Sequence, residues 1–193
     1  MNQICSNIAS GVNFCLHTLR EVKSTPVNNF QVLATINQTE CKSNCGFVAM
    51  RVYDCLSGRG CNPIRSHDSK ALDPLCERDV YGKLDDAYMG EKSFRFECFT
   101  GSQIDIIFQC EQILLELNLY EHAIVNFQYI LGDGSTKGHF INVLQVEEGY
   151  QIIDAIDEQE FYRYFSYYNL YDYFHVKLPR VGAESLSKIS IIF

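Results

Sequence analysis

Three strand-like segments in the C-terminal half, joined by two short breaks that contain glycine, constrain the fold of this chain most. The segments cover residues 123–131, 139–146 and 150–156. The breaks read Gly-Asp-Gly at 132–134 and Glu-Glu-Gly at 147–149. Breaks of this length and composition join neighbouring antiparallel strands in hairpins. The sequence therefore predicts an antiparallel sheet built from consecutive strands in this half.

Helical spacing of apolar residues is the main signal before these strands. It predicts helices over 45–56, closed by Ser57-Gly58, and over 103–118, while strands are predicted over 30–36 and 93–99. The wide apolar face of the second helix consists of Ile104, Ile107, Phe108, Leu114 and Leu115. Helices early and a meandering sheet late are typical of the α+β class, with the first helix packed on the sheet.

No repeat, linker or low-complexity block divides the sequence, so one domain over residues 1–193 is predicted. The predicted order is an N-terminal helix and lead-in strand in 1–43, the helix that begins at Cys45 in 44–58, a surface excursion and second helix in 59–120, and the sheet followed by an aromatic helix in 121–193. In the aromatic segment 161–174, tyrosines are expected to pack the helix on the sheet, although a ligand-stacking platform or a partner-binding groove has the same composition.

Composition excludes several classes of protein. Apolar residues make up 47% and aromatic residues 13% of the chain, which argues against disorder. Sixteen basic and 24 acidic residues give a net charge of −8, which disfavours nucleic acid as a partner. No apolar run reaches the ~18 residues of a membrane span. Residues 1–23 place their apolar side chains on one helical face without a basic start, which predicts a packed amphipathic helix and not a cleaved signal peptide.

Nine cysteines are many for this length, and their number is odd and their spacing irregular. They predict mostly free or buried thiols in a reducing cytosol and no disulfide framework. Zinc binding is the alternative, but the spacings are wider than the usual C-x2-C pair of a structural site. The ligands for zinc would come from Cys41, Cys45, Cys55, Cys61, Cys76 and His67. We expect no metal and no cofactor.

Cys45 is the cysteine best suited to chemistry. It follows the polar loop that ends in Asn44 and opens a predicted helix, where unpaired N–H groups and the helix dipole favour a thiolate. Gly46 leaves the sulfur open to a substrate. Cys55 lies late in the same helix, where the dipole disfavours the anion. The cysteines expected to act as small hydrophobic residues are Cys5, Cys15, Cys98 and Cys110.

Among the five histidines, His139 is the best candidate for a general base because it stands at the start of a strand. Asp154 lies on the next strand and can come level with it across one hairpin turn, where a carboxylate would hold the ring and stabilise the imidazolium. Asp157 is the alternative acid. Asn142 is expected to point away from His139 and to be structural. The other histidines, expected to be structural or exposed, are His17, His67, His122 and His175, the last in a C-terminal strand.

A thiol enzyme of this kind also needs donors for the oxyanion that forms in the reaction. The backbone N–H of Cys45 is the first of these. The side-chain amides of Gln38 and Asn44 are the further candidates because both lie shortly before the cysteine.

Two short segments resemble the papain-like superfamily of cysteine enzymes in its bacterial toxin and effector branch. Asn44-Cys45-Gly46 is similar to the nucleophile helix of papain-fold toxins that deamidate glutamine, and of the peptidases that process bacteriocins. Gly138-His139-x-x-Asn142, with Gly149 and Asp154 downstream, resembles the histidine and acid strands of the toxin type. The glutamine that tends to follow the acid in that type is absent, since Ala155 to Asp157 occupy its place. The resemblance implies a papain-like fold and a Cys45–His139–Asp154 triad.

The residues and the resemblance together predict a cysteine-dependent hydrolase of protein amide bonds, either a glutamine deamidase or a peptidase. An acyl transferase of the transglutaminase type would use the same triad. The alternative outside enzymes is a non-catalytic papain-fold module that binds proteins through its tyrosine-rich segment. The expected partner is a protein substrate, such as a host protein. The resemblance also implies a bacterial effector that folds in the cytoplasm or is delivered into a host cell by a dedicated secretion system.

Overall fold

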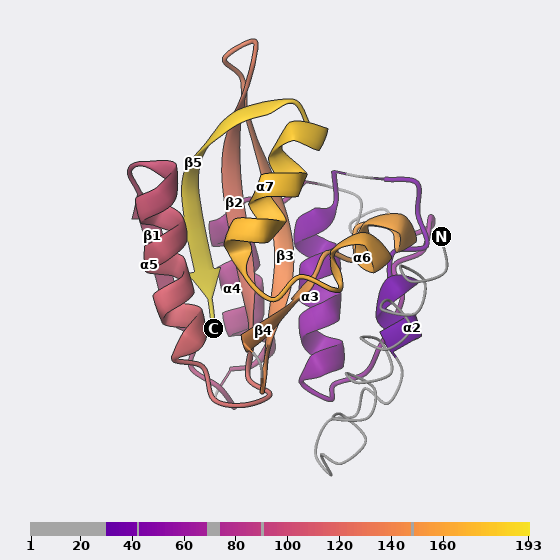
Figure 1. The fold of residues 1–193 in the computed structure, drawn as a ribbon. Helices are drawn as coiled ribbons and strands as arrows, with labels where there is room; N and C mark the ends of the chain where they lie inside the picture. The colour runs from indigo at the N-terminus through magenta and orange to yellow at the C-terminus, as the bar shows by residue number, and fades with distance from the viewer. Residues whose placement is uncertain (1–29, 42, 69–73, 90, 148) are drawn as a thin grey trace, which may run out of the picture.

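The computed structural model describes residues 30–193 apart from 42, 69–73, 90 and 148. A five-stranded antiparallel sheet lies at its centre in the order β1-β5-β2-β3-β4 (Figure 1). The strands are β1 (Phe96–Thr100), β2 (His122–Leu131), β3 (Thr136–Val146), β4 (Gly149–Ile153) and β5 (Ala183–Ile192). The α+β class predicted from the sequence is confirmed, and the hairpins β2-β3 and β3-β4 join the strands that were expected to pair.

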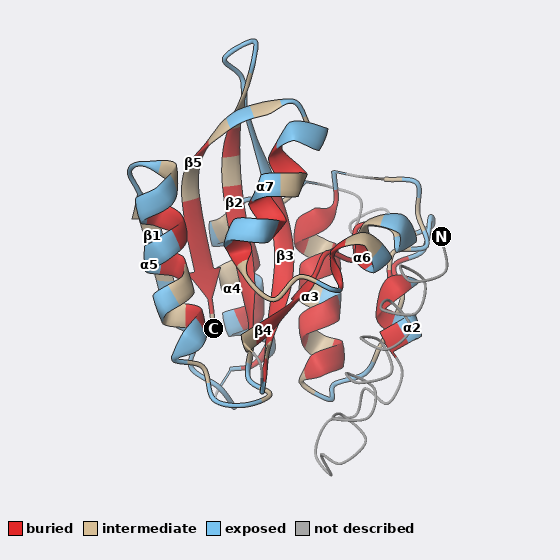
Figure 2. Ribbon diagram, viewed as in Figure 1, coloured by how far each residue is buried: buried red, intermediate tan, exposed pale blue. Residues whose placement is uncertain are grey.

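Helices cover both faces of the sheet and make two apolar cores. On one face α3 (Cys45–Leu56) and α4 (Glu77–Ala87) pack against the sheet, with α2 (Phe30–Ala34) beside them. On the other face lie α5 (Gln103–Leu115) and α7 (Leu170–Arg180). The short helix α6 (Glu158–Tyr164) supplies Phe161 to the first core and Tyr164 to the second. Figure 2 shows the buried strands between the helices, whose outer faces are exposed.

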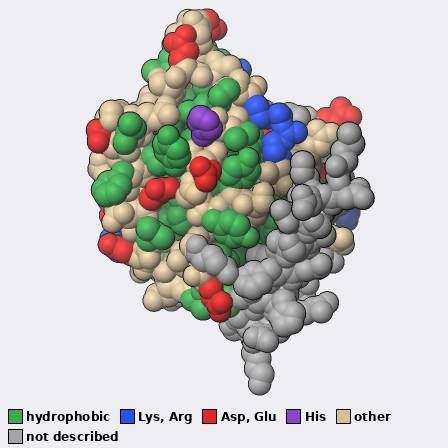
Figure 3. All heavy atoms as spheres, in the orientation of Figure 1, with side chains coloured by type: hydrophobic (Ala, Val, Ile, Leu, Met, Phe, Trp, Pro, Cys, Tyr) green, Lys and Arg blue, Asp and Glu red, His purple; other side chains and the backbone are tan. Residues whose placement is uncertain are grey.

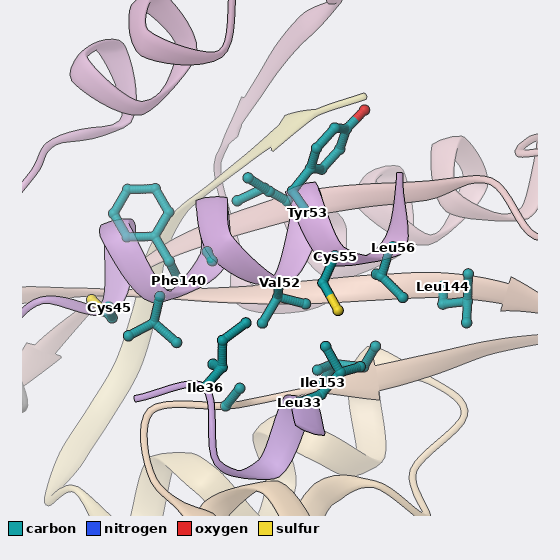
Figure 4. Packing of buried hydrophobic residues seen from close by; sticks show 14 of the residues in the cluster. Leu33, Ile36, Cys45, Val52, Tyr53, Cys55, Leu56, Phe140, Leu144 and Ile153 are labelled. Atoms are coloured by element: carbon teal, nitrogen blue, oxygen red, sulfur yellow. The ribbon is translucent and has the colours of Figure 1, made fainter. Parts of the chain in front are cut away.

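The helix α3 positions the predicted nucleophile, and its limits follow from the sequence. Asn44 is the N-cap, and its carbonyl accepts the N–H of Val48 at 3.1 Å. At the other end Gly58 has a φ of 80° and its N–H closes onto the carbonyl of Cys55 at 3.2 Å, a left-handed ending that glycine adopts without strain. Between them, Val52 and Cys55 are fully buried (Figure 4). The predicted helix that begins at Cys45 and packs on the sheet is confirmed.

The register of β3 and β4 decides which side chains meet at the end of the sheet. Asn142 pairs with Ile153, so the next position, Asp154, lies beyond the last pair and opposite Ile141. Side chains alternate between faces along a strand, and therefore Asp154 faces the same side as Ile141 and His139. Asn142 faces the other side, where its side-chain N–H donates to the carbonyl of Ala49 at 3.0 Å.

Several predicted elements differ from those observed. Residues 30–36 were expected to form a strand, but Phe30, Leu33 and Ala34 are buried at helical spacing in α2. The aromatic segment 161–174 is not one helix, because Asn169 caps a new helix at Leu170 through the N–H of Asp172. His175 consequently lies in α7 and not in a C-terminal strand. The tyrosines of segment 161–174 pack in the core only in part, since Tyr164 and Tyr173 are fully buried whereas Tyr162 and Tyr171 are exposed.

The helix α4 has no counterpart in the sequence prediction, and the predicted C-terminal strand, placed around His175, is found later in the chain as β5. The N-cap of α4 is Cys76, whose side chain accepts the N–H of Asp79, while the carboxylate of Asp79 accepts the N–H of Cys76 at 3.0 Å. Cys45 is therefore not the only cysteine at a helix start. The strand β5 pairs with both β1 and β2, which makes it the second strand of the sheet in space.

Two expectations about burial are also wrong. In α5, Ile106, Ile107, Cys110 and Leu114 face the core, whereas Ile104, Phe108 and Leu115 of the predicted apolar face are exposed. Cys98, expected inside, is exposed because β1 is the edge strand of the sheet.

The predicted helix in residues 1–23, with Cys5, Cys15 and His17, lies outside the described residues. Within the part that the structure describes, no helix has the length and apolar character to cross a membrane.

Cys55 and Cys61 form a disulfide, one pairing that the prediction of mostly free or buried thiols without a disulfide framework did not include. Cys55 lies in the last turn of α3, and the turn through Gly58 and Gly60, both with positive φ, brings Cys61 back beside it. Cys45, Cys76, Cys98 and Cys110 remain thiols.

Candidate active site

Cys45 lies at the first position of α3, against the beginning of β3, and its side chain is hydrogen-bonded to that of His139. The residue is only 8% exposed, so the sulfur is largely shielded from bulk water. The backbone N–H of Phe140 also donates to it. Both donors favour the anionic form of the sulfur, as does the helix start behind it.

His139 connects the thiol to Asp154. Its Nε2 lies 2.8 Å from Oδ1 of Asp154, which leaves Nδ1 as the ring nitrogen available to Cys45. The ring is buried and meets Phe127 edge to face at 5.4 Å between centroids. A carboxylate bonded to one nitrogen fixes the tautomer and the rotation of the ring, so the other nitrogen stays aimed at the thiol.

The pKa values of the three groups are shifted in the directions that favour a thiolate–imidazolium pair. Burial raises the pKa of Cys45, but the hydrogen bond and charge of His139 and the N–H of Phe140 outweigh it, so the pKa is lowered. For His139, burial acts to lower the pKa, and Asp154 and Cys45 together raise it to about 9. The pKa of the buried Asp154 carboxyl is lowered, because His139 and Lys177 overcome the cost of burial.

The second oxygen of Asp154 is held by two residues that sequence analysis missed. The hydroxyl of Tyr173 and the Nζ of Lys177 each donate to Oδ2 at 2.9 Å. Lys177 also donates to Glu160 at 2.6 Å. Tyr173 and Lys177 lie one turn apart on α7, at the i,i+4 spacing that places two side chains on one face of a helix. That spacing is the only sign in the sequence that the two side chains act together. It does not show that they contact Asp154, because that contact depends on α7 packing beside it.

Of the two predicted oxyanion amides, that of Asn44 is engaged elsewhere, while the role of Gln38 stays a prediction. Asn44 is fully buried, and its side-chain amide exchanges hydrogen bonds of 3.4 Å with that of Asn37. Asn37 in turn donates to the carbonyl of Ile156 at 2.7 Å, which ties the loop before α3 to the segment after Asp154. The side chain of Gln38 is exposed. The backbone N–H of Cys45 stays available because the first N–H groups of a helix have no partner within it.

Asp157, the alternative acid, serves a structural purpose. Its carboxylate caps α6 by accepting the N–H of Glu160 at 2.8 Å. The hydrogen bond to His139 comes from Asp154.

The alternative zinc site is also not assembled. The sulfurs of Cys55 and Cys61 are joined in the disulfide, and the side chain of Cys45 is hydrogen-bonded to His139. Among the described residues, no group of three or more His, Cys, Asp or Glu side chains is arranged to hold a metal ion.

A pocket of about 240 Å³ opens beside His139 on the side of the sheet that α7 covers. Its wall is formed by Tyr129, His139, Ile156, Asp157, Glu160, Lys177, Arg180 and Val181. The pocket therefore borders the imidazole that contacts Cys45, and it can accept part of a bound molecule.

Comparisons with known proteins give distant structural likenesses. No protein-family model and no curated protein matches the sequence. Two variants of the Salmonella effector SpvD are similar, at 16% and 15% identity and TM-scores of 0.42 and 0.37. The matches cover 84% and 93% of this chain and 74% and 90% of theirs. The Pseudomonas avirulence protein AvrPphB is similar at 9% identity and a TM-score of 0.34, over 90% of this chain and 97% of its own. At these values, a function for this chain has to be argued from its own residues.

Proposed function

We propose that this protein is a cysteine-dependent amide hydrolase in which Cys45 is the nucleophile, His139 the general base and acid, and Asp154 the group that orients the imidazole. The observation that supports this most is the continuous hydrogen-bonded series from the thiol through the ring to a buried carboxylate. A structural cysteine needs none of these partners. A thiolate nucleophile needs both the imidazole and the carboxylate, because each favours the thiolate–imidazolium pair over the neutral pair.

In the proposed reaction, the Cys45 thiolate attacks the carbonyl carbon of a substrate amide, and a carbon–sulfur bond forms. The carbonyl oxygen becomes an oxyanion, which the backbone N–H of Cys45 can bind. Protonated His139 gives its proton to the amide nitrogen, the carbon–nitrogen bond breaks, and an acyl-enzyme remains. Water then loses a proton to His139 and attacks the thioester. The products are a carboxylate and the amine, and the thiolate–imidazolium pair is restored.

This chemistry serves a glutamine deamidase, which releases ammonia, and a peptidase, which releases a peptide amine. An acyl transferase of the transglutaminase type differs only in that an amine replaces water. We propose a protein substrate, such as a host protein, and an effector role after delivery into a host cell, on the strength of the sequence resemblance around Cys45 and His139. The likeness to the Salmonella effector and the Pseudomonas avirulence protein adds no argument at these TM-scores.

Selective alkylation of Cys45 tests the proposal without a substrate. Iodoacetamide at pH 6 should modify Cys45 far faster than the other thiols, with peptide mapping by mass spectrometry as the readout. Cys76 is a matched internal control because it also stands at a helix start, is exposed, and has no histidine partner among the described residues. Faster modification of Cys76 than of Cys45 would show that the imidazole does not activate Cys45, and would favour a non-catalytic binding module.

Intact-mass measurement of candidate protein substrates identifies the reaction. A gain of about 1 Da indicates deamidation, two fragments indicate cleavage, and an amine adduct indicates transfer. Cys45→Ala should remove every such product while the protein stays folded. Activity should persist in a metal chelator and disappear after thiol alkylation, since the proposed nucleophile comes from the protein. Loss of activity in chelator, with a metal recovered from the purified protein, would contradict the mechanism.

A further inference from the structure

The side chains of Tyr173, Lys177 and Glu160 form a network behind Asp154 that the reaction as described does not use. Lys177 is 5% exposed, although it carries an ammonium group. A buried cation is costly unless it is paired and hydrogen-bonded. Both of its carboxylate partners, Asp154 and Glu160, lie within hydrogen-bonding distance of the same nitrogen. The two carboxylates are therefore close neighbours, and Lys177 is the group that lies between them.

The hydrogen bonds divide the two oxygens of Asp154 between two tasks. Oδ1 bonds to His139, whereas Oδ2 accepts from both Tyr173 and Lys177. A carboxylate held at Oδ2 by two donors on one rigid helix cannot rotate about its own axis without breaking both bonds. The bond at Oδ1 is then directed at the imidazole by donors on α7.

The network continues to the surface, where basic side chains pair with Glu160. Glu160 has Lys177 on one oxygen, and Arg180 at 3.4 Å and Arg163 at 3.7 Å on the other. Figure 3 shows Lys and Arg side chains gathered beside the C-terminal end of α7. The exposed end of the network thus balances Glu160, and Lys177 remains available to balance Asp154.

We propose that Lys177 is a positioning residue for the Cys45–His139–Asp154 site: by bridging Asp154 and Glu160 it keeps Asp154 ionised and turned toward His139. The inference rests on the proposed function of that site. Without the bridge, two neighbouring carboxylates would repel one another across a poorly hydrated space, and one of them would take up a proton. If Asp154 took up that proton, the imidazolium would lose its counter-charge and Cys45 would lose its ionised partner.

The direction in which Lys177→Met shifts the pKa of His139 distinguishes a positioning residue from a cation that is only nearby. A cation that merely stands near His139 lowers its pKa, so Lys177→Met would raise it. If Lys177 is a positioning residue, Lys177→Met lowers the pKa of His139, because losing the negative charge of Asp154 lowers that pKa more than losing the cation raises it. The titratable and charged groups that face this region are Cys45 of α3, Tyr129 of β2, His139 of β3, Asp157 after β4, Glu160, Arg163 and Tyr164 of α6, and Tyr173 and Arg180 of α7.

The test is an NMR titration of the His139 ring, whose Cε1–H signal is assigned by its absence in His139→Gln. In Lys177→Met the pKa of His139 should fall by one unit or more, and the rate of Cys45 alkylation at pH 6 should fall about 10-fold. Lys177→Arg, which keeps the charge, should retain most of the wild-type behaviour. In Lys177→Met/Glu160→Gln the repulsion is removed with the bridge, so the pKa of His139 should return to within half a unit of wild type.

An unchanged or raised pKa in Lys177→Met would overturn the proposal, and so would a double variant that stays as low as the single one. If Lys177→Met does not fold, Tyr173→Phe tests the proposal instead, because it removes one donor to Oδ2 of Asp154 and leaves the packing intact. Its His139 pKa should fall, by less than in Lys177→Met, and an unchanged or raised value would again overturn the proposal. The titration does not depend on turnover. If the wild-type protein shows selective alkylation of Cys45 but the pKa of His139 rises in Lys177→Met, only this inference is refuted. If the wild-type protein shows no selective alkylation of Cys45, the proposed function is refuted.

Discussion

His122 begins β2 and His139 lies within β3 opposite Phe127, and the surroundings of the two rings move their pKa values in opposite directions. Burial acts to lower both. For His122, burial and the charge of Lys92 lower the pKa to about 4. For His139, burial is outweighed by Asp154 and Cys45, and the pKa rises to about 9. The comparison teaches that removal from water alone makes a histidine neutral, and that a buried carboxylate is needed to make it a cation.

The polar partners of the two rings differ in the same way. His122 shares a hydrogen bond of 2.9 Å with the hydroxyl of Ser57 and lies 4.4 Å from the ring of Tyr53, both neutral groups. His139 has an ionised acid and a thiol. His122 therefore stabilises the end of α3, whereas His139 is equipped to exchange protons.

The largest expected effect separates the two histidines directly. His139→Gln should reduce the rate of Cys45 alkylation at pH 6 by about 10²-fold, because a thiol of ordinary pKa is only ~0.3% ionised there. His122→Gln, in which the amide can still bond to Ser57, should stay within about twofold of wild type. Alkylation followed by mass spectrometry measures both. Equal losses in the two variants would mean that the distinction between the histidines is wrong.

Asp154→Asn tests the carboxylate that makes the difference. An amide cannot stabilise the imidazolium and favours the wrong tautomer, so turnover should fall by roughly 10²- to 10⁴-fold. The pKa of His139 should fall toward its ordinary range in an NMR titration. Asp157→Asn is the matched control, since that side chain caps α6 and should affect turnover little. The reverse result would place the acid at Asp157.

Stability should depend on pH through both rings, with opposite signs. The folded pKa of His139, about 9, is above its unfolded value of 6.5, so its contribution is complete below pH 6.5 and is lost as the pH rises through 9. The folded pKa of His122, about 4, is below 6.5, so its contribution is complete above pH 6.5 and is lost as the pH falls through 4. Urea unfolding from pH 4 to 9 should show His122→Gln flattening only the acid side. Flattening on the alkaline side would contradict the assignment.

The smallest expected effect concerns the hydroxyl of Ser57. Ser57→Ala removes one neutral hydrogen bond to His122 and should lower the free energy of unfolding by about 1 kcal/mol. Cys45 alkylation should not change, since Ser57 ends α3 and Cys45 begins it. A changed alkylation rate would show that the two ends of this helix are coupled.

Local signals predicted the parts of the molecule that local chemistry determines. The glycine-containing breaks fixed the order β2-β3-β4, and alternation along β3 and β4 placed His139 and Asp154 on one face while Asn142 pointed away. The helix of Cys45 follows from apolar spacing and a glycine ending. None of these inferences requires knowledge of a distant contact.

The parts that the sequence did not predict depend on distant contacts or on unusual caps. The position of β5 follows from pairing with β1, whose paired residues lie 88 to 96 positions earlier in the chain. The helix α4 begins at a cysteine, which is not a preferred N-cap residue. Lys177 and Tyr173 become part of the site only because α7 packs beside Asp154. The Cys55–Cys61 disulfide depends on the path of the turn between them, which spacing alone does not define.

The central position of β5 has a consequence for synthesis on the ribosome. Cys45, His139 and Asp154 all emerge before Ala183, but β1 is hydrogen-bonded within the described sheet to β5 alone, and β5 also covers one edge of β2. A nascent chain that already carries the whole candidate site therefore still has an unattached β1 and an open edge on β2. Open strand edges invite pairing with other chains, so such a chain is exposed to mispairing until β5 is made.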